Sequence, residues 1–166
     1  MFFELERNWT GILIEPVPSL YQSILSKNRN IFSINACIAE SKPIVAKFRI
    51  CDALSGRLKE MKDSHSNRIN MESGCEKMIL LYVPCFSLNT ILSAINVKKV
   101  DYFSLDVEGG EYSVLQSIKF DKTTIDSFSI EHNGFADEKD KIISHLQNKG
   151  FTNIKSDIQD VYFLRK

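Results

Sequence analysis

The sequence lacks an excess of charge of either sign, because 21 lysine and arginine residues are balanced by 21 aspartate and glutamate residues among 166. Proteins that bind nucleic acid or an anionic membrane surface usually carry a basic excess, so neither partner is expected. No apolar run approaches the roughly 18 residues of a membrane-spanning helix. The opening residues MFFELERNW have no positive segment followed by an apolar one, and no signal peptide is expected there.

Cysteine is also scarce, with four residues at Cys37, Cys51, Cys75 and Cys85. None forms a C-x-x-C pair or lies near a histidine at the spacing of a zinc site. The spacing does not exclude disulfides. The preferred interpretation is free and mostly buried thiols in a cytoplasmic protein, because the cytosol keeps thiols reduced.

Apolar runs of strand length alternate with helical periodicity along most of the chain. The opening residues read as the tail of a helix. Strands are expected at residues 9–15, 31–39, 44–50, 78–84, 100–107 and 125–131, and helices at residues 18–28, 87–95, 111–118 and 137–149, with Ser87 and Asp137 as N-caps and Gly150 as a stop. Residues 51–77 are polar and irregular and predict a long loop. The pattern predicts one α/β domain over residues 1–166, mostly parallel inside, with a C-terminal antiparallel strand pair at 151–154 and 161–164.

Three of the predicted strands end in acidic residues. Glu15 follows the first, Asp106 and Glu108 follow the strand at 100–107, and Glu131 with His132 ends the strand at 125–131. The carboxyl ends of parallel strands lie along one edge, where α/β sheets bind ligands. We therefore expect these side chains to converge on a site.

Each of these residues also has a plainer interpretation. Glu15 could accept hydrogen bonds from both hydroxyls of a ribose, or it could be a solvated acid. Asp106 and Glu108 share one face of their strand and need a partner if buried, whereas Glu111 fits a stabilising place in the first turn of a helix. His132 could be a general base or a structural hydrogen-bond donor. Asp106, Glu108 and Glu131 could gather around a divalent ion, but no spacing demands one, so no metal ligand is assigned and metal dependence stays open.

Several stretches resemble, in order, the motifs of FkbM-type S-adenosylmethionine-dependent methyltransferases. They are WTGILIEPVP (9–18), NACIA (35–39), residues 83–92, DYFSLDVEGGEYSVL (101–115) and SIEHN (129–133). The DVEGGE part of this series, at residues 106–111, is the most specific. Together the matching stretches span nearly the whole chain.

The resemblance implies a Rossmann-like class I methyltransferase fold that transfers a methyl group from S-adenosylmethionine to a hydroxyl of a sugar, glycan or small metabolite. It places Glu15, Pro16, Ala36, Cys37 and Asp106 at the cofactor. It places Asp106, Glu108 and His132 at the methyl group and its acceptor.

The sequence departs from this family at one point. The first strand of the fold, with its glycine-rich loop of the type D-x-G-A-x-x-G, should precede the opening helix and is absent. We therefore expect a sheet without its first strand, as in an N-terminally truncated or remodelled copy. The alternative function is a catalytically inactive methyltransferase-like domain that serves in binding or as a scaffold.

Overall fold

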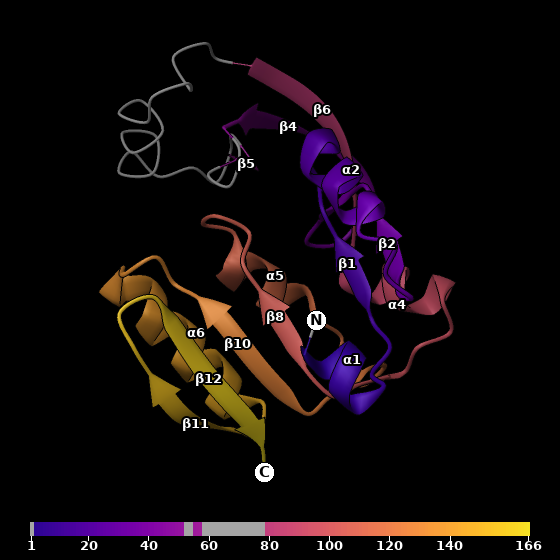
Figure 1. The fold of residues 1–166 in the computed structure, drawn as a ribbon. Coiled ribbons are helices and arrows are strands. Elements are labelled where there is room, and N and C mark those ends of the chain that lie inside the picture. Colours follow the sequence, from indigo (N-terminus) through magenta and orange to yellow (C-terminus); the bar gives the residue numbers. More distant parts are fainter. Residues whose placement is uncertain (1, 52–54, 58–78) are drawn as a thin grey trace.

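A computed structural model describes residues 2–51, 55–57 and 79–166 of this chain. The chain has mixed α/β architecture (Figure 1). The strands of its described residues are divided among four separate sheets. Most of the long polar loop expected at residues 51–77 lies outside the described residues. No helix in the described part of the chain is long and apolar enough to cross a membrane.

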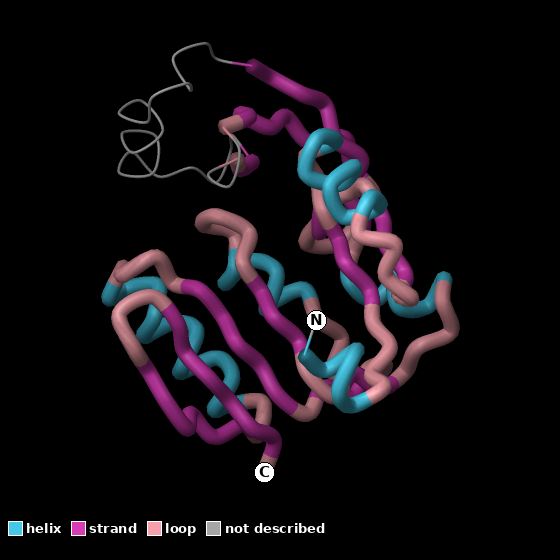
Figure 2. The backbone as a smooth tube through the Cα atoms, in the orientation of Figure 1, coloured by secondary structure: helices cyan, strands magenta, loops and turns pink. Residues whose placement is uncertain are grey.

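The C-terminal region is a four-stranded sheet with two helices on one face (Figure 2). Its strand order is β11-β12-β10-β8. The strands are β8 (Phe103–Leu105), β10 (Ser127–Glu131), β11 (Phe151–Ser156) and β12 (Asp160–Arg165), and the helices are α5 (Glu111–Ser117) and α6 (Ala136–Asn148). β8 and β10 are parallel, while β12 runs antiparallel to both β10 and β11. The expected antiparallel pair at the C-terminal end is therefore confirmed.

Alternation along these strands builds the main core. The side chains that face the helices are mostly apolar, and Leu105, Phe128, Ile130, Phe151, Val161 and Phe163 are buried. Phe128 packs edge-on against Phe151, with ring centroids 5.1 Å apart. The apolar face of α6 completes this core through Ile142 and Leu146, both fully buried.

The N-terminal region begins with α1 (Phe2–Arg7), which leads into a parallel pair of short strands. The pair consists of β1 (Ile12–Ile14) and β2 (Phe32–Ile34), joined by α2 (Pro18–Ser26). Neither strand contains a fully buried residue. β1 and β2 therefore form a much more open layer than the C-terminal sheet.

A second four-stranded sheet follows, with the order β3-β6-β4-β5. It contains β3 (Cys37–Ile38), β4 (Ile44–Ile50), β5 (Gly56–Arg57) and β6 (Ile79–Phe86). Most of its pairing is the long antiparallel ladder between β4 and β6. The chain then passes through α4 (Leu88–Ala94), and a parallel pair formed by β7 (Lys99–Val100) and β9 (Thr124–Ile125) leads into β8 and β10.

The expectation of free thiols is wrong for the cysteines that the structure describes. Cys37 and Cys85 stand opposite each other on β3 and β6 and form a disulfide. Cys51 is disulfide-bonded as well. These three cysteines are buried, as expected. Their pairing follows from strand register, which a sequence separation of 48 residues does not reveal.

The expectation of one mostly parallel sheet also needs correction. Antiparallel strand pairs are as frequent as parallel ones in the described residues. Residues 31–39, expected as one strand, divide into β2 and β3, which belong to different sheets. β1 and β8 do not pair with each other in the described chain, so the parallel strands do not form one continuous sheet.

The two predicted helix caps have different outcomes. Ser87 caps α4, because its hydroxyl accepts a hydrogen bond from the Thr90 amide at 3.2 Å. Asp137 does not cap α6, which begins one residue earlier at Ala136. Asp137 instead lies in the first turn, where its charge is favourable to the helix dipole. Gly150 follows α6 with a φ of 86°, as expected for a helix stop.

Candidate functional site

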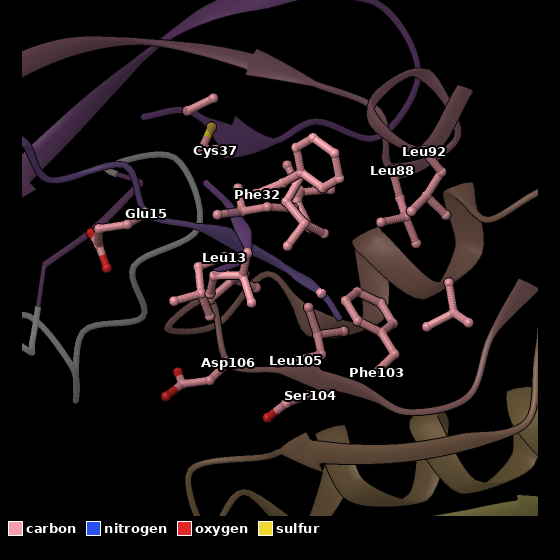
Figure 3. Close-up of a pocket in the computed structure, with 18 of the residues that line it drawn as sticks. Leu13, Glu15, Phe32, Cys37, Leu88, Leu92, Phe103, Ser104, Leu105 and Asp106 are labelled. Atoms are coloured by element: carbon pink, nitrogen blue, oxygen red, sulfur yellow. The ribbon is translucent and has the colours of Figure 1, made fainter. Parts of the chain in front are cut away.

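A cavity of about 810 Å³ lies between β1 and β8. Its two ends differ in chemistry (Figure 3). Glu15 and Asp106 lie at one end, where β1 and β8 finish. Apolar side chains fill the space between the strands, among them Leu13, Phe103 and Leu105. The cavity is therefore a polar opening joined to an apolar slot.

Glu15 is fixed in the turn that follows β1. Its carboxylate accepts a hydrogen bond from the Val17 amide at 2.7 Å. The side chain of Asn35 donates to the main-chain oxygens of Glu15 and Pro16, at 2.7 Å and 3.1 Å, and so ties this turn to the end of β2. Partial burial raises the pKa of Glu15, and the nearby charge of Asp106 raises it further. Glu15 and Asp106 therefore lie close enough to interact, as the sequence predicted.

The turn from β8 into α5 has an unusual backbone. Glu108 and Gly109 both have positive φ angles, of 56° and 109°. A left-handed conformation is costly for a residue with a Cβ atom, so Glu108 must be held by its surroundings. The buried carboxylate of Glu111 supplies that support, because it accepts hydrogen bonds from the Val107 and Gly109 amides at 3.0 Å and 3.1 Å. Glu111 thus has the structural role expected for it.

Three carboxyl groups converge beyond this turn. Asp106, Glu108 and Glu131 each offer an oxygen, and these atoms lie within 4.8 Å of one another. Burial, a hydrogen bond with Asp106 and the neighbouring acidic charges raise the pKa of Glu131 to about 8. At neutral pH Glu131 therefore keeps a proton, which it can donate in a hydrogen bond to Asp106.

The same three carboxyl groups could hold a divalent cation, with water completing its coordination. A bound cation is not needed to offset the electrostatic repulsion among these carboxylates, because a proton on Glu131 reduces it as well. No metal ligand was assigned from the sequence, and the proximity of these groups shows only which residues would bind one.

The remaining candidates are divided between the cavity wall and the core. Pro16, Ala36 and Cys37 line the cavity, as a cofactor role would require. His132 is not among the lining residues. Its ring is buried, with 4% of the residue exposed, and neither ring nitrogen has a hydrogen-bond partner in the described part of the chain. The structure therefore brings Asp106 and Glu108 together with Glu131, and leaves His132 apart from the cavity.

One contributor was assigned no catalytic or cofactor role, and another was not anticipated. Glu131 was expected at the site as a strand-end acid, and it ends β10 beside Asp106 because β8 and β10 run parallel and in register. Asn35 had no comparable signal, because its two hydrogen bonds depend on the fold of the chain between β1 and β2.

The comparisons with known proteins show the family of this chain. The family model of the methyltransferase FkbM domain matches residues 1–152. No curated protein and no solved structure matches the chain. The match covers most of the 166 residues, including every residue assigned above to the cavity and the carboxyl cluster. The chain therefore belongs to the FkbM methyltransferase domain family.

Proposed function

We propose that this chain, as one domain, is an S-adenosylmethionine-dependent methyltransferase that methylates a hydroxyl group on a sugar or small metabolite. The observation that supports this function is the convergence of Glu15 with the Asp106 cluster at the polar end of one cavity. A site of this kind needs an acceptor for ribose hydroxyls and a nearby proton acceptor. The two strand ends supply both.

The residues at the polar end fit the cofactor that the family implies. The carboxylate of Glu15 has lone pairs beyond the one used by the Val17 amide and could accept hydrogen bonds from a ribose. Ala36 and Cys37 would flank the adenine, while Pro16 lines the cavity in the turn that follows Glu15. S-adenosylmethionine would supply a methyl group already activated by its sulfonium sulfur.

The reaction requires an acceptor hydroxyl to be oriented and its proton removed. Asp106 is exposed at the polar end and is our first choice for this proton acceptor. Glu131, which keeps a proton below about pH 8, would hold Asp106 in place through their hydrogen bond. The carboxylate of Glu108 would accept hydrogen bonds from further hydroxyl groups of the molecule that receives the methyl group.

His132 is the second choice for the base, because a histidine can titrate near neutral pH. Its ring would have to reach the acceptor from outside the cavity lining. The variants Asp106→Asn and His132→Gln separate the two choices. If Asp106 is the base, single-turnover methyl transfer falls by roughly 100-fold or more in Asp106→Asn and much less in His132→Gln.

The alternative function is a methyltransferase-like domain without catalysis that binds a ligand or another protein. The open slot favours it, because the wall of the cavity between β1 and β8 contains no strand in the described chain. The two functions differ in cofactor binding and turnover, and both can be measured.

The first experiment is calorimetric titration of the purified chain with S-adenosylmethionine and with its demethylated product. We expect micromolar binding that Glu15→Ala and Asp106→Ala each weaken by about tenfold or more. Asp121→Ala is the matched control, because Asp121 is exposed and outside the cavity lining. A folded chain that binds neither compound would contradict the enzymatic function and support the alternative.

A further inference from the structure

β12 brings a further carboxyl group to the cluster of Asp106, Glu108 and Glu131. Asp160, the first residue of β12, lies directly opposite Glu131 of β10. Directly opposed residues place their side chains on the same face of a sheet, with Cβ atoms about 5 Å apart. Partial burial raises the pKa of Asp160, and the charges of Asp157 and Asp106 raise it further. The ends of β8, β10 and β12 therefore bring their acids close enough to interact.

A tight turn before β12 holds Asp160 in place. The carboxylate of Asp157 accepts hydrogen bonds from the Gln159 and Asp160 amides, at 3.2 Å and 2.8 Å. The His132 amide donates to the Gln159 carbonyl at 2.7 Å, which anchors this turn to the end of β10. The main chain of Asp160 is thus fixed, while its carboxylate accepts no hydrogen bond from the described residues. That carboxylate is available to a ligand.

Tyr162 lies two residues further along β12, on the same face of the sheet. Its side chain is partly exposed, and the amino group of Lys155 lies 5.1 Å from the centre of its ring. Tyr162 lies opposite Ser129 of β10, and Ser129 lies opposite Ser104 of β8. Two small hydroxyl side chains therefore lead across the sheet from β8 to one large aromatic ring.

The face that carries these side chains is continuous with the polar end of the cavity. Ser104 and Asp106 line the cavity and point to the same side of β8 (Figure 3). α5 and α6 cover the opposite face of the sheet (Figure 2). α1 lies at the far end of β8, where the rings of Phe3 and Tyr102 are 6.1 Å apart (Figure 1). In the described part of the chain, the face around Asp160 is therefore not covered by a helix.

The expected place of the cofactor leaves this face for the methyl acceptor. Glu15, Ala36 and Cys37 would hold the cofactor, and all three lie on the side of Asp106 where β1, β2 and β3 end. On its other side Asp106 has Glu131 of β10 as its neighbour. Methyl transfer requires the acceptor hydroxyl to be aligned with the methyl group. A hydroxyl that also reaches Asp106 would therefore approach from the side of β10 and β12.

The side chains on this face suit a neutral ring that carries several hydroxyl groups. Carboxylates accept hydrogen bonds, so hydroxyl donors match them, whereas an anionic group such as a phosphate would be repelled. A tyrosine ring offers a flat apolar surface with a polar tip, which suits the less polar side of a sugar ring.

We propose that Asp160 and Tyr162 form a binding subsite for a neutral pyranose ring of the methyl acceptor. The sugar ring lies against Tyr162, and its hydroxyl groups donate hydrogen bonds to Asp160. This inference rests on the proposed function, because the subsite serves the reaction at Asp106. Both residues lie beyond residues 1–152, so the match to the family model does not account for them.

The test is a titration of the ¹⁵N-labelled chain with methyl pyranosides of glucose, mannose and galactose, followed by NMR. It is run with and without the demethylated product of S-adenosylmethionine. We expect at least one of these sugars to bind in the millimolar range and to shift the amide signals of residues 129–131 and 160–162. Glucose 6-phosphate should bind more weakly than methyl glucoside, by roughly fivefold or more, because its charge is repelled by these acids.

Variants of β12 identify the side chains that bind the sugar. Asp160→Ala and Tyr162→Ala should each weaken binding by about tenfold, because each removes a principal contact. Tyr162→Phe keeps the ring and should retain most of the affinity. Leu164→Ala is the matched control, because Leu164 is an exposed residue on the same face of β12, at the end far from Asp160.

The outcomes separate this subsite from the proposed function. Calorimetric titration with S-adenosylmethionine reports on the cofactor site alone. A chain that binds a pyranoside at β12 but not the cofactor would contradict the proposed function and leave the sugar site standing. A folded chain whose β12 amides respond to none of the pyranosides would overturn the subsite, whether or not the cofactor binds. Equal or tighter binding of glucose 6-phosphate, or an equal loss in Leu164→Ala, would overturn it as well.

Discussion

The C-terminal and N-terminal regions of this molecule are stabilised in different ways. The C-terminal sheet has α5 and α6 against one face and fully buried phenylalanines between them. In the N-terminal region, large apolar side chains are exposed on α1 and β2, with Phe2 and Phe32 each 59% exposed. There α1 is held by the ion pair between Glu4 and Arg29, and the sheet that follows β2 is cross-linked by the Cys37–Cys85 disulfide.

The comparison teaches that core formation here follows strand pairing. β10 pairs on both sides, and its apolar side chains reach 0–1% exposure. β1 pairs on one side, and all three of its residues stay partly exposed. A strand is fully buried only when neighbours are present on both edges and both faces.

The largest expected effect is the loss of a core aromatic from the C-terminal region. Phe128 is 1% exposed and packs against the rings of Phe103, Phe120 and Phe151. We expect Phe128→Ala to lower the free energy of unfolding by about 3–5 kcal/mol. Denaturant unfolding gives the value. Phe32→Ala is the matched control and should cost less than about 1 kcal/mol. Similar losses for the two variants would remove the contrast between the regions.

The next largest effect is expected from the disulfide in the N-terminal region. Replacing both Cys37 and Cys85 by alanine should lower the stability by about 2–4 kcal/mol, because the unfolded chain loses a long cross-link. Thermal unfolding with and without dithiothreitol measures this. The double variant keeps the disulfide of Cys51, so any reductant sensitivity that remains reports on that bond.

The redox state of Cys37 and Cys85 also bears on the cellular compartment in which the protein is found. Disulfides persist mainly in oxidising compartments, whereas the sequence led us to expect a cytoplasmic protein. Mass spectrometry of alkylated protein from cells would show the redox state of Cys37 and Cys85. Reduced thiols in a folded protein would keep the cytoplasmic prediction and weaken the contribution of the disulfide to stability.

A smaller effect is expected where the C-terminal region meets the cavity. Glu111→Ala removes the acceptor of the Val107 and Gly109 amides and should lower stability by about 1–3 kcal/mol. Glu111→Gln keeps one side-chain oxygen, so its loss should be smaller. Unfolding by urea distinguishes the two variants. Equal and negligible losses would show that the left-handed turn at Glu108 does not need this carboxylate.

The smallest effect is a pH dependence from Glu131. Its pKa is raised to about 8 in the folded chain, so the native state binds a proton that the unfolded state releases near pH 4.5. The contribution of this group to stability is therefore present below about pH 4.5 and is lost as the pH rises to about 8.

Glu131→Gln should remove this dependence and make the stability at pH 8 closer to that at pH 5. The difference should be on the order of 1 kcal/mol, because the half-buried group is screened by solvent. Urea unfolding at the two pH values measures it. An unchanged pH profile would show that the folded chain does not raise the pKa of Glu131.

The sequence predicted local elements better than their assembly. The Ser87 cap and the stop at Gly150 depend on neighbouring residues, and both are present in the structure. The strand expected at 125–131 is divided instead between β9 and β10, which belong to different sheets. The division of residues 31–39 between β2 and β3 could not be predicted in this way. It depends on partners that are distant in sequence, since Cys37 pairs with Cys85.

The same distinction holds for the candidate site. Glu15 and Asp106 were predictable because each follows an apolar strand, and parallel strands bring their ends together. The catalytic role of His132 remains a prediction. Its position outside the cavity lining depends on the fold of the chain that follows β10, which the local sequence does not reveal. The raised pKa of Glu131 was not predictable, since it arises from burial and from acids on another strand.

The place of β12 in the C-terminal sheet has a consequence for synthesis. β12 lies between β10 and β11, so β11 has no hydrogen-bonded neighbour in its sheet until β12 has formed. During translation β10 and β11 leave the ribosome before the strand that joins them, and Val161 and Phe163 are the last buried residues to emerge. A nascent chain arrested before residue 160 would therefore expose the apolar side of β11, and such chains should be preferred substrates for chaperones.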